Sequence, residues 1–140
     1  MNDTILLAHG SGGKLSHDLV EKRFLPLLAN SMLNRLDDSA IFEASGKLAF
    51  TTDGYVVNPI FFPGGDIGKL AVCGTINDLA MSGAKPLYLS LSMIIEEGLL
   101  MDELERVVLS IKAVAQEAGV DIITGDTKVV NQGQADKLFI

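Results

Sequence analysis

Aspartates at the ends of strand-like and helix-like segments are the residues of this sequence that could do chemistry together. Four such sites are spread along the chain, at Asp38, which follows Asp37, and at Asp53, Asp78 and Asp126. Carboxylates placed where secondary structure elements end can converge on one point. A shared cluster of this kind would suit a divalent cation such as Mg²⁺, because that ion prefers oxygen ligands.

Two of these aspartates flank a predicted β-hairpin. Residues 39–44 and 47–52 have the pattern of strands, and Ser45-Gly46 joins them. In an antiparallel pair the start of one strand lies beside the end of the other, so Asp38 and Asp53 are expected to meet at one edge. Two carboxylates this close repel each other unless a cation is present. A magnesium site meets that requirement, although a solvated turn aspartate is the simpler interpretation of each residue alone.

A glycine-rich segment near the start of the chain offers a second kind of chemistry. His9-Gly10-Ser11-Gly12-Gly13-Lys14 leads into a helical pattern that starts at Leu15. Free N–H groups at the start of a helix can bind phosphate. The segment nevertheless fails both common motifs, because a Walker loop needs glycine at Ala8 and a dinucleotide fingerprint needs glycine at Leu15. A phosphate contact and a flexible loop without a catalytic role both stay open.

Composition excludes several classes of protein. With 140 residues and 48% hydrophobic content, the chain can bury a core as one domain. The net charge of -7 argues against non-specific nucleic-acid binding, which depends on lysine and arginine. An acidic protein can still hold a nucleotide when Mg²⁺ bridges carboxylates and phosphates, although solubility alone also explains the charge.

The expected compartment is the cytoplasm. The apolar runs are a few residues long, far short of the roughly 20 that span a bilayer. The start, Met1-Asn2-Asp3-Thr4, lacks the basic residues of a secretory signal. The single cysteine, Cys73, excludes an internal disulfide and is expected to be a buried structural thiol.

The elements that must position the aspartates alternate between strand and helix. Helices are predicted from Leu15, with a bend or end near Pro26, from the cap Asp66, and over residues 102–118, with Asp102 as cap. Asn77 and Asp78 come late in the second helix, either exposed at its end or buried with a partner. Strands are predicted at residues 87–95, 121–124 and 138–140, and Gly125-Asp126-Thr127 is expected to be a turn. This alternation predicts an α/β domain with a mixed sheet covered by helices.

Four motifs in order carry a resemblance to a known family. They are Asp37-Asp38-Ser39-Ala40-Ile41, Thr52-Asp53-Gly54, residues 77–84 and Gly125-Asp126-Thr127. Together they resemble the amino-terminal ATP-binding domain of the aminoimidazole ribonucleotide synthetase superfamily, which includes selenophosphate synthetase and thiamine monophosphate kinase. Residues 9–14 and 52–68 are similar to the hydrogenase maturation (HypE-type) branch in particular, and the resemblance covers nearly all of the chain.

The resemblance implies a fold. It is α/β (α+β), with a mixed, mainly antiparallel sheet and helices on one face, and two such sheets join into a barrel in a homodimer. Residues 1–140 would form a single ATP-binding amino-terminal domain. The carboxy-terminal domain of the family and its terminal cysteine are absent from this chain, so we expect the chain alone to be inactive.

The resemblance also implies an activity, with ATP and Mg²⁺ as cofactors. A carbamoyltransferase partner (HypF type) places a carbamoyl group on the terminal cysteine thiol of the full-length protein. ATP-dependent dehydration then leaves a thiocyanate, which supplies cyanide to the iron of nickel-iron hydrogenase on a scaffold complex (HypC-HypD type). No nucleic acid or membrane partner is expected. A related kinase or synthetase half and a non-catalytic dimerisation or docking module are the alternatives.

Matching to the motifs of the family implies roles for single residues. Asp78 and Lys128 would be catalytic, and Lys128 could stabilise the transferred phosphate or assist proton movement. The implied metal ligands are Asp38, Asp53, Asp78 and Asp126. The implied nucleotide contacts are Gly12, Gly13, Lys14, Asn77 and Thr127.

Overall fold

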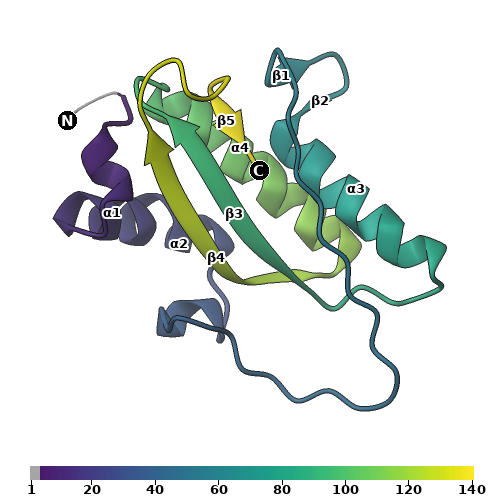
Figure 1. Cartoon of the computed structure of the whole chain (residues 1–140). Coiled ribbons are helices and arrows are strands. Elements are labelled where there is room, and N and C mark those ends of the chain that lie inside the picture. Colours follow the sequence, from purple (N-terminus) through teal and green to yellow (C-terminus); the bar gives the residue numbers. More distant parts are fainter. Residues whose placement is uncertain (1–3) are drawn as a thin grey trace.

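A three-stranded sheet in the order β4-β3-β5 forms the centre of the computed structural model, which describes residues 4–140 (Figure 1). β3 (Tyr88–Glu96) pairs in parallel with β4 (Asp121–Val130) and antiparallel with β5 (Leu138–Phe139). α4 (Met101–Ala118) joins β3 to β4, and a helical crossover of this kind brings the second strand back parallel to the first. Residues 1–3, part of the start considered for a secretory signal, lie outside the described residues.

Two helices cover one face of the sheet (Figure 1). α3 (Ile67–Met81) follows the small hairpin of β1 (Phe61–Phe62) and β2 (Gly65–Asp66), and it packs against α4. β3 alternates strictly between buried and exposed residues along its length, so only one of its faces contributes to the core. The buried stripe of α4 supplies the other half of that core, through Met101, Leu104, Val107, Val108, Ile111 and Ala115.

The helix ends follow local signals in the sequence. Asp66 caps α3, because its Oδ1 accepts a hydrogen bond from the Lys69 amide at 2.9 Å. Gly119 ends α4 in the left-handed conformation, at φ 68°. Asp102, predicted as the cap of α4, lies instead within its first turn, and Leu100 occupies the cap position without a side-chain bond. A carboxylate in the first turn still interacts favourably with the helix dipole.

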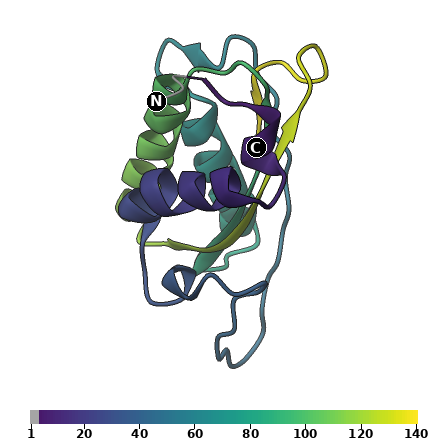
Figure 2. The ribbon, with the colours of Figure 1, turned by 90° about the vertical axis from the view of Figure 1, so that its left-hand side faces the viewer.

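A helical segment at the start of the chain packs against the sheet at β4 (Figure 2). It consists of η1 (Leu7–Gly10), α1 (Lys14–Leu19), a π-helical turn η2 (Val20–Phe24), α2 (Leu25–Leu28) and η3 (Leu33–Arg35). The π turn lies next to Pro26, which has no N–H to donate and whose ring clashes with the carbonyl one turn earlier in an ordinary helix. The helix ends at Leu28, so of the predicted bend or end near Pro26 the end is confirmed.

The expectation of a mainly antiparallel sheet is wrong for this chain. The sheet is mixed, but its long ladder is the parallel pairing of β3 with β4, and the antiparallel pairing with β5 is short. β4 also continues through Val130, so Gly125, Asp126 and Thr127 lie inside a strand and not in a turn beyond it. Gly125 permits this, because a Cβ atom there would lie 2.4 Å from the Leu91 carbonyl oxygen on β3. Only glycine allows the two strands to approach this closely.

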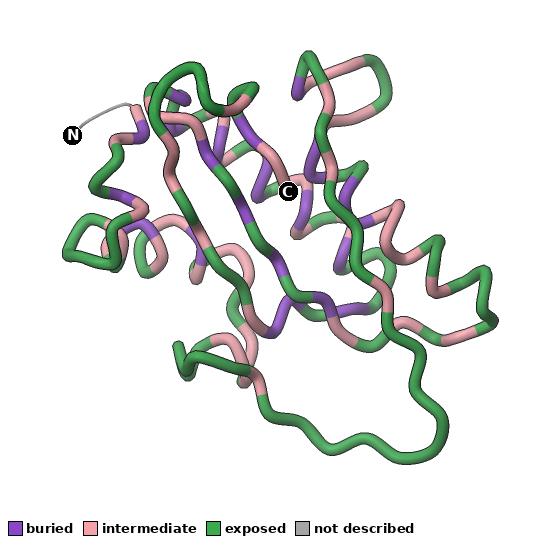
Figure 3. Tube along the Cα trace, in the orientation of Figure 1, coloured by how far each residue is buried: buried purple, intermediate pink, exposed green. Residues whose placement is uncertain are grey.

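The predicted hairpin of residues 39–52 is absent from the described chain. Residues 36–58, here called the long loop, contain no strand and run along the outside of the molecule (Figures 1 and 3). The long loop exposes six large apolar side chains, with Phe50 at 91%: Leu36, Ile41, Phe42, Leu48, Phe50 and Val56. A two-stranded hairpin without a third strand or a helix to pack against is only marginally stable, which explains why the strand pattern of the sequence is not realised here.

Gly68 sets the distance between α3 and α4. A Cβ atom there would lie 2.7 Å from the Val107 carbonyl oxygen and 2.8 Å from Ile111 Cγ1. We expect Gly68→Ala to lower the free energy of unfolding by about 1–3 kcal/mol, because the helices must separate. Thermal and denaturant unfolding will measure the change. Gly54→Ala is the matched control, since no atom lies within 4 Å of a Cβ atom there; equal stability of the two variants would contradict the prediction.

Candidate functional site

A cavity of about 320 Å³ lies between the N-terminal helical segment and the sheet. Its inner wall is apolar and comes from the helical segment and the buried face of β3, with Leu19, Phe24 and Met93 among its residues. Polar residues from two distant parts of the chain also line it: His9, Gly12 and Ser16 from the start, and Asp126, Thr127 and Lys128 from β4. The fold therefore brings the glycine-rich segment and the last predicted aspartate to one place.

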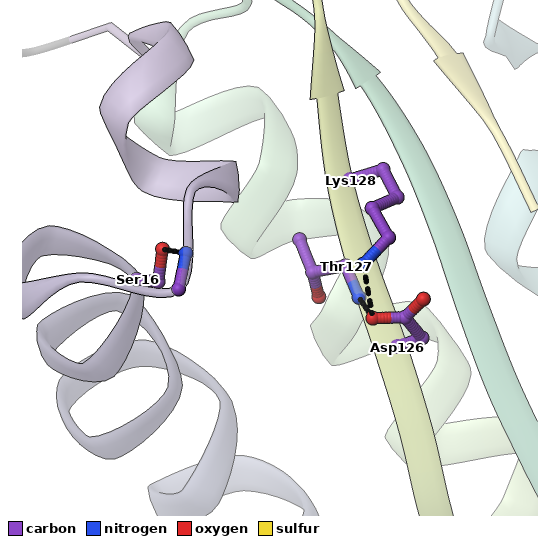
Figure 4. Close-up of polar contacts among 5 residues, drawn as sticks. Ser16, Asp126, Thr127 and Lys128 are labelled. Atoms are coloured by element: carbon purple, nitrogen blue, oxygen red, sulfur yellow. Dashed lines mark hydrogen bonds and ion pairs between the residues drawn. The ribbon is translucent and has the colours of Figure 1, made fainter.

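The β4 side of this cavity carries an ion pair (Figure 4). Lys128 Nζ lies 3.2 Å from Asp126 Oδ1, and the same oxygen accepts a hydrogen bond from the Thr127 amide at 2.9 Å. Both side chains are exposed, 63% for Lys128 and 60% for Asp126. An exposed pair contributes little to stability, so both groups are available to a ligand at little cost.

The glycine-rich segment is held close to β4. A Cβ atom on Gly10 would lie 2.4 Å from the backbone nitrogen of Val129, so only glycine permits this contact. The Gly12 amide donates to Ser16 Oγ at 2.9 Å, and Gly12 itself adopts φ 79°. The segment is therefore an ordered turn whose amide already has a hydroxyl partner. Ser16 was not predicted as a site residue, and only its position one turn into the helix could have indicated it.

A second cavity of about 190 Å³ lies between the long loop, α3 and β3. Asp53, Tyr55 and Thr75 line it, and the Tyr55 side chain lies against α3 at Gly74, where a Cβ atom would collide with the Tyr55 hydroxyl. The Tyr55 hydroxyl and Thr75 Oγ1 share a hydrogen bond at 3.3 Å. Backbone hydrogen bonds with Ile140, at 2.6 and 3.2 Å, hold Tyr55 in place. Tyr55 thus anchors the end of the long loop that carries Asp53.

The charges of two of the predicted carboxylates reach Tyr55. Burial raises the pKa of the Tyr55 phenol above its ordinary value of 10.0, the hydrogen bond from Thr75 lowers it, and the charges of Asp53 and Asp78 raise it further. Asp53 and Asp78 therefore both act on the same hydroxyl. Asn77 and Asp78 are exposed on α3, so the exposed interpretation of this pair is the one observed.

This pKa shift gives a pH prediction. A folded-state pKa above the unfolded value favours the neutral phenol, so its contribution to stability is complete below about pH 10 and is lost as pH rises through the folded pKa. We expect the free energy of unfolding to fall more steeply above about pH 10 in the wild type than in Tyr55→Phe. Denaturant unfolding at several alkaline pH values measures the slopes. Parallel slopes for the two proteins would show that Tyr55 is not responsible.

The predicted site residues divide between these two places. Gly12, Asp126, Thr127 and Lys128 line the first cavity, Asp53 lines the second, and Asp78 lies near it. The other predicted residues line neither cavity: Gly13, Lys14, Asp38 and Asn77. The expected meeting of Asp38 and Asp53 depended on a hairpin that does not form in the single chain, so it stays a prediction without that support. Asp37, the neighbour of Asp38, lines the first cavity instead.

The predicted carboxylate ligands are of the chemical type that Mg²⁺ binds, but within the described residues a single chain does not bring them close enough together. Carboxylate oxygens are the ligands that this ion prefers. Within residues 4–140, however, no group of three or more histidine, cysteine, aspartate or glutamate side chains lies close enough together to hold a metal ion. The first cavity, in contrast, suits a phosphate group, since its border offers the Lys128 cation and the ordered glycine turn.

Comparison with known proteins adds independent findings. Residues 36–140 match the family described as AIR synthase related protein, N-terminal domain. The chain is 54% identical over 140 residues to the carbamoyl dehydratase HypE of Bradyrhizobium diazoefficiens, and the match covers 99% of this chain and 40% of that protein. The chain therefore spans about two fifths of the length of this curated relative.

Solved structures give the same result. A crystal structure of the hydrogenase maturation protein HypE in complex with ATP is similar, with a TM-score of 0.95 and 57% identity, over 97% of this chain and 41% of that chain. A chain of a HypE-HypF complex is similar, with a TM-score of 0.63 and 48% identity, over 86% of this chain and 39% of that chain. In the part of the chain that the structure describes, no helix is long and apolar enough to cross a membrane.

Proposed function

Because this chain belongs to the AIR synthase related protein family, and matches the N-terminal domain of that family, we propose that it is the ATP-binding part of a HypE-type carbamoyl dehydratase. The observation that carries the proposal is the first cavity, where the glycine-rich turn meets Asp126, Thr127 and Lys128. The similar HypE structure in complex with ATP supports the choice of nucleotide. The cytoplasm, which supplies ATP, is the proposed compartment.

The proposed reaction removes water from a carboxamide carried on the terminal cysteine of the full-length protein. The amide oxygen attacks the γ-phosphorus of ATP, and ADP leaves. The carbon–oxygen bond then breaks with phosphate as the leaving group, both N–H protons are lost, and a nitrile remains on sulfur as a thiocyanate. An amide oxygen is a poor leaving group and phosphate is a good one. Phosphorylation by ATP therefore gives the amide oxygen the good leaving group that dehydration requires.

Residues of this chain would provide charge and position for the transfer. Lys128 would bring its ammonium group to the transferred phosphate, because phosphoryl transfer depends mainly on positioning and neutralisation of charge. Asp126, 3.2 Å from that ammonium, would orient it. Gly12 and Gly13 would border the triphosphate together with Lys14, and Thr127 would contribute its hydroxyl at the cavity. Asn77 would contact the nucleotide from α3.

We assign Mg²⁺ to the assembled, nucleotide-bound protein. Asp38, Asp53, Asp78 and Asp126 are the proposed ligands, and Asp78 is also a proposed catalytic residue. One chain does not bring three such groups together, so no step of the reaction is assigned to the ion. Asp38 and Asp53 lie at the two ends of the long loop, whose position can change when a partner binds.

We also propose a homodimer formed through the long loop. A concentration of exposed apolar side chains on one segment favours an interaction site, and the outward face of β3 presents Ser90, Ser92 and Ile94. The unformed strands of residues 39–52 would then pair across the interface and join two sheets into a barrel. Through this assembly the full-length protein would meet a HypF-type carbamoyltransferase, as the HypE-HypF complex suggests, and a HypC-HypD-type scaffold.

Calorimetry and turnover on the full-length protein test the proposed function. ATP is expected to bind with and without Mg²⁺, more tightly with the ion, and protein that carries the carboxamide is expected to release ADP and phosphate in equal amounts as the thiocyanate forms. Release of phosphate without thiocyanate would favour a related kinase or synthetase. Absence of any ATP binding would leave only a dimerisation or docking module.

A further inference from the structure

His9 is a buried imidazole at the cavity to which the sequence assigns no role. Its residue is 8% exposed, and it is the only buried polar or charged residue among those that the structure describes. It belongs to η1, which packs against β4 where Gly10 touches Val129, and it lines the same cavity as Lys128. Burial of an imidazole without full hydrogen bonding is unfavourable, so each ring nitrogen is expected to have a hydrogen-bond partner.

One nitrogen is fixed by the backbone. The amide of Leu6 donates to His9 Nδ1 at 2.9 Å, so Nδ1 carries a lone pair and no proton. In a neutral imidazole the proton then lies on Nε2, which makes Nε2 a hydrogen-bond donor. The tautomer is thus set by the turn that η1 makes, before any ligand binds.

The other nitrogen, Nε2, has no such partner in the described part of the chain. Within residues 4–140, Nε2 has no hydrogen-bond partner, while no fully buried side-chain nitrogen or oxygen in the same residues lacks one. Nε2 therefore keeps contact with solvent, and the open space that His9 lines is the first cavity. A buried, oriented donor on the lining of a cavity that Lys128 also lines suits a ligand that only accepts hydrogen bonds and carries negative charge.

We propose that His9 is a positioning residue that donates a hydrogen bond from Nε2 to a phosphate oxygen of the bound nucleotide. The inference rests on the proposed function, because it takes ATP as the occupant of this cavity. A triphosphate offers acceptors only, and a neutral N–H donor in the same cavity as Lys128 adds direction to a contact that the lysine makes mainly through charge. The Leu6 amide would hold the ring in place during turnover.

The variant His9→Asn tests the contribution of Nε2 separately from that of Nδ1. In His9→Asn the amide oxygen stands near the position of Nδ1 and can still accept from Leu6, but no atom reaches the position of Nε2. We expect His9→Asn in the full-length protein to weaken ATP binding about 10- to 100-fold in calorimetry, since hydrogen bonds to charged groups contribute about 1.5–3 kcal/mol. Its unfolding temperature and its affinity for adenosine, which has no phosphate, should match the wild type.

Nuclear magnetic resonance of ¹⁵N-labelled histidine gives a second measurement that does not require a variant to fold. In the free wild-type protein, His9 should show a protonated Nε2 and an unprotonated Nδ1, and addition of ATP should shift the Nε2 signal. If the wild type binds ATP but His9→Asn binds it equally well, or if the Nε2 signal stays unchanged, the role of His9 is overturned while the proposed function stands. If the wild type binds no ATP, the proposed function fails first.

Discussion

Replacement of Asp126 by asparagine is expected to lower ATP-dependent dehydration by the full-length protein about 100-fold or more, the size of effect seen when one preorganised electrostatic group is removed from an active site. The carboxylate of Asp126 lies 3.2 Å from Lys128 Nζ and accepts the Thr127 amide, so it fixes both neighbours at the cavity. Asparagine keeps the shape and removes the charge. The loss should therefore fall on kcat, measured by phosphate release, while the fold stays intact.

Asp121→Asn is the matched control for this experiment. Asp121 is an exposed aspartate at the start of the same strand and lines neither cavity, so the same change of chemistry there should leave kcat unaltered. A wild-type rate for Asp126→Asn would remove Asp126 and its partner Lys128 from the reaction. Equal losses in both variants would point to a general effect of charge on β4 and not to the cavity.

Phe50→Glu is expected to weaken self-association of the full-length protein about 100-fold or more. Phe50 is 91% exposed in the single chain, on a loop that presents five further large apolar side chains. Burial of one phenylalanine contributes about 1.5–3 kcal/mol, and a symmetric dimer loses two copies of it at once. Sedimentation or light scattering over a range of concentrations measures the change.

The control for self-association lies on the opposite side of the sheet. Leu109 is 45% exposed on α4, so Leu109→Glu introduces the same charge at an apolar surface position far from the long loop. It should leave the dimer unchanged. A wild-type protein that stays monomeric at every concentration would contradict the proposed dimer, and an unchanged dimer in Phe50→Glu would place the interface elsewhere.

The parts of the fold that the sequence predicted well are those determined by local interactions. Asp66 caps α3 because its own side chain reaches the Lys69 amide, and Gly119 ends α4 because glycine adopts the left-handed conformation readily. A strand at residues 87–95 was predicted from its aliphatic content and is β3, although only one of its faces is buried. Neither helix end depends on a distant partner, whereas β3 has its pattern in the sequence but is completed by its pairing with β4 and β5.

The parts that the sequence did not predict depend on contacts between distant segments. Residues 39–52 have the pattern of strands, but a strand needs a neighbour, and the described chain provides none. Asp126 was placed in a turn because Gly125 precedes it, although this glycine serves the close approach of β4 to β3. Tyr55 packs against Gly74, which is far from it in sequence. No periodicity in a single sequence indicates such a contact.

The close approach at Gly125 bears on how sequence variation at this site should be understood. Strict retention of glycine there across relatives would follow from main-chain spacing alone, because any side chain would collide with the Leu91 carbonyl. Neighbouring Asp126 faces no such steric limit, since its side chain is 60% exposed. Conservation of position 126 would thus reflect selection for chemistry, whereas conservation of position 125 would reflect only the spacing of the strands. Two neighbouring positions could be equally conserved in an alignment of relatives for unrelated reasons.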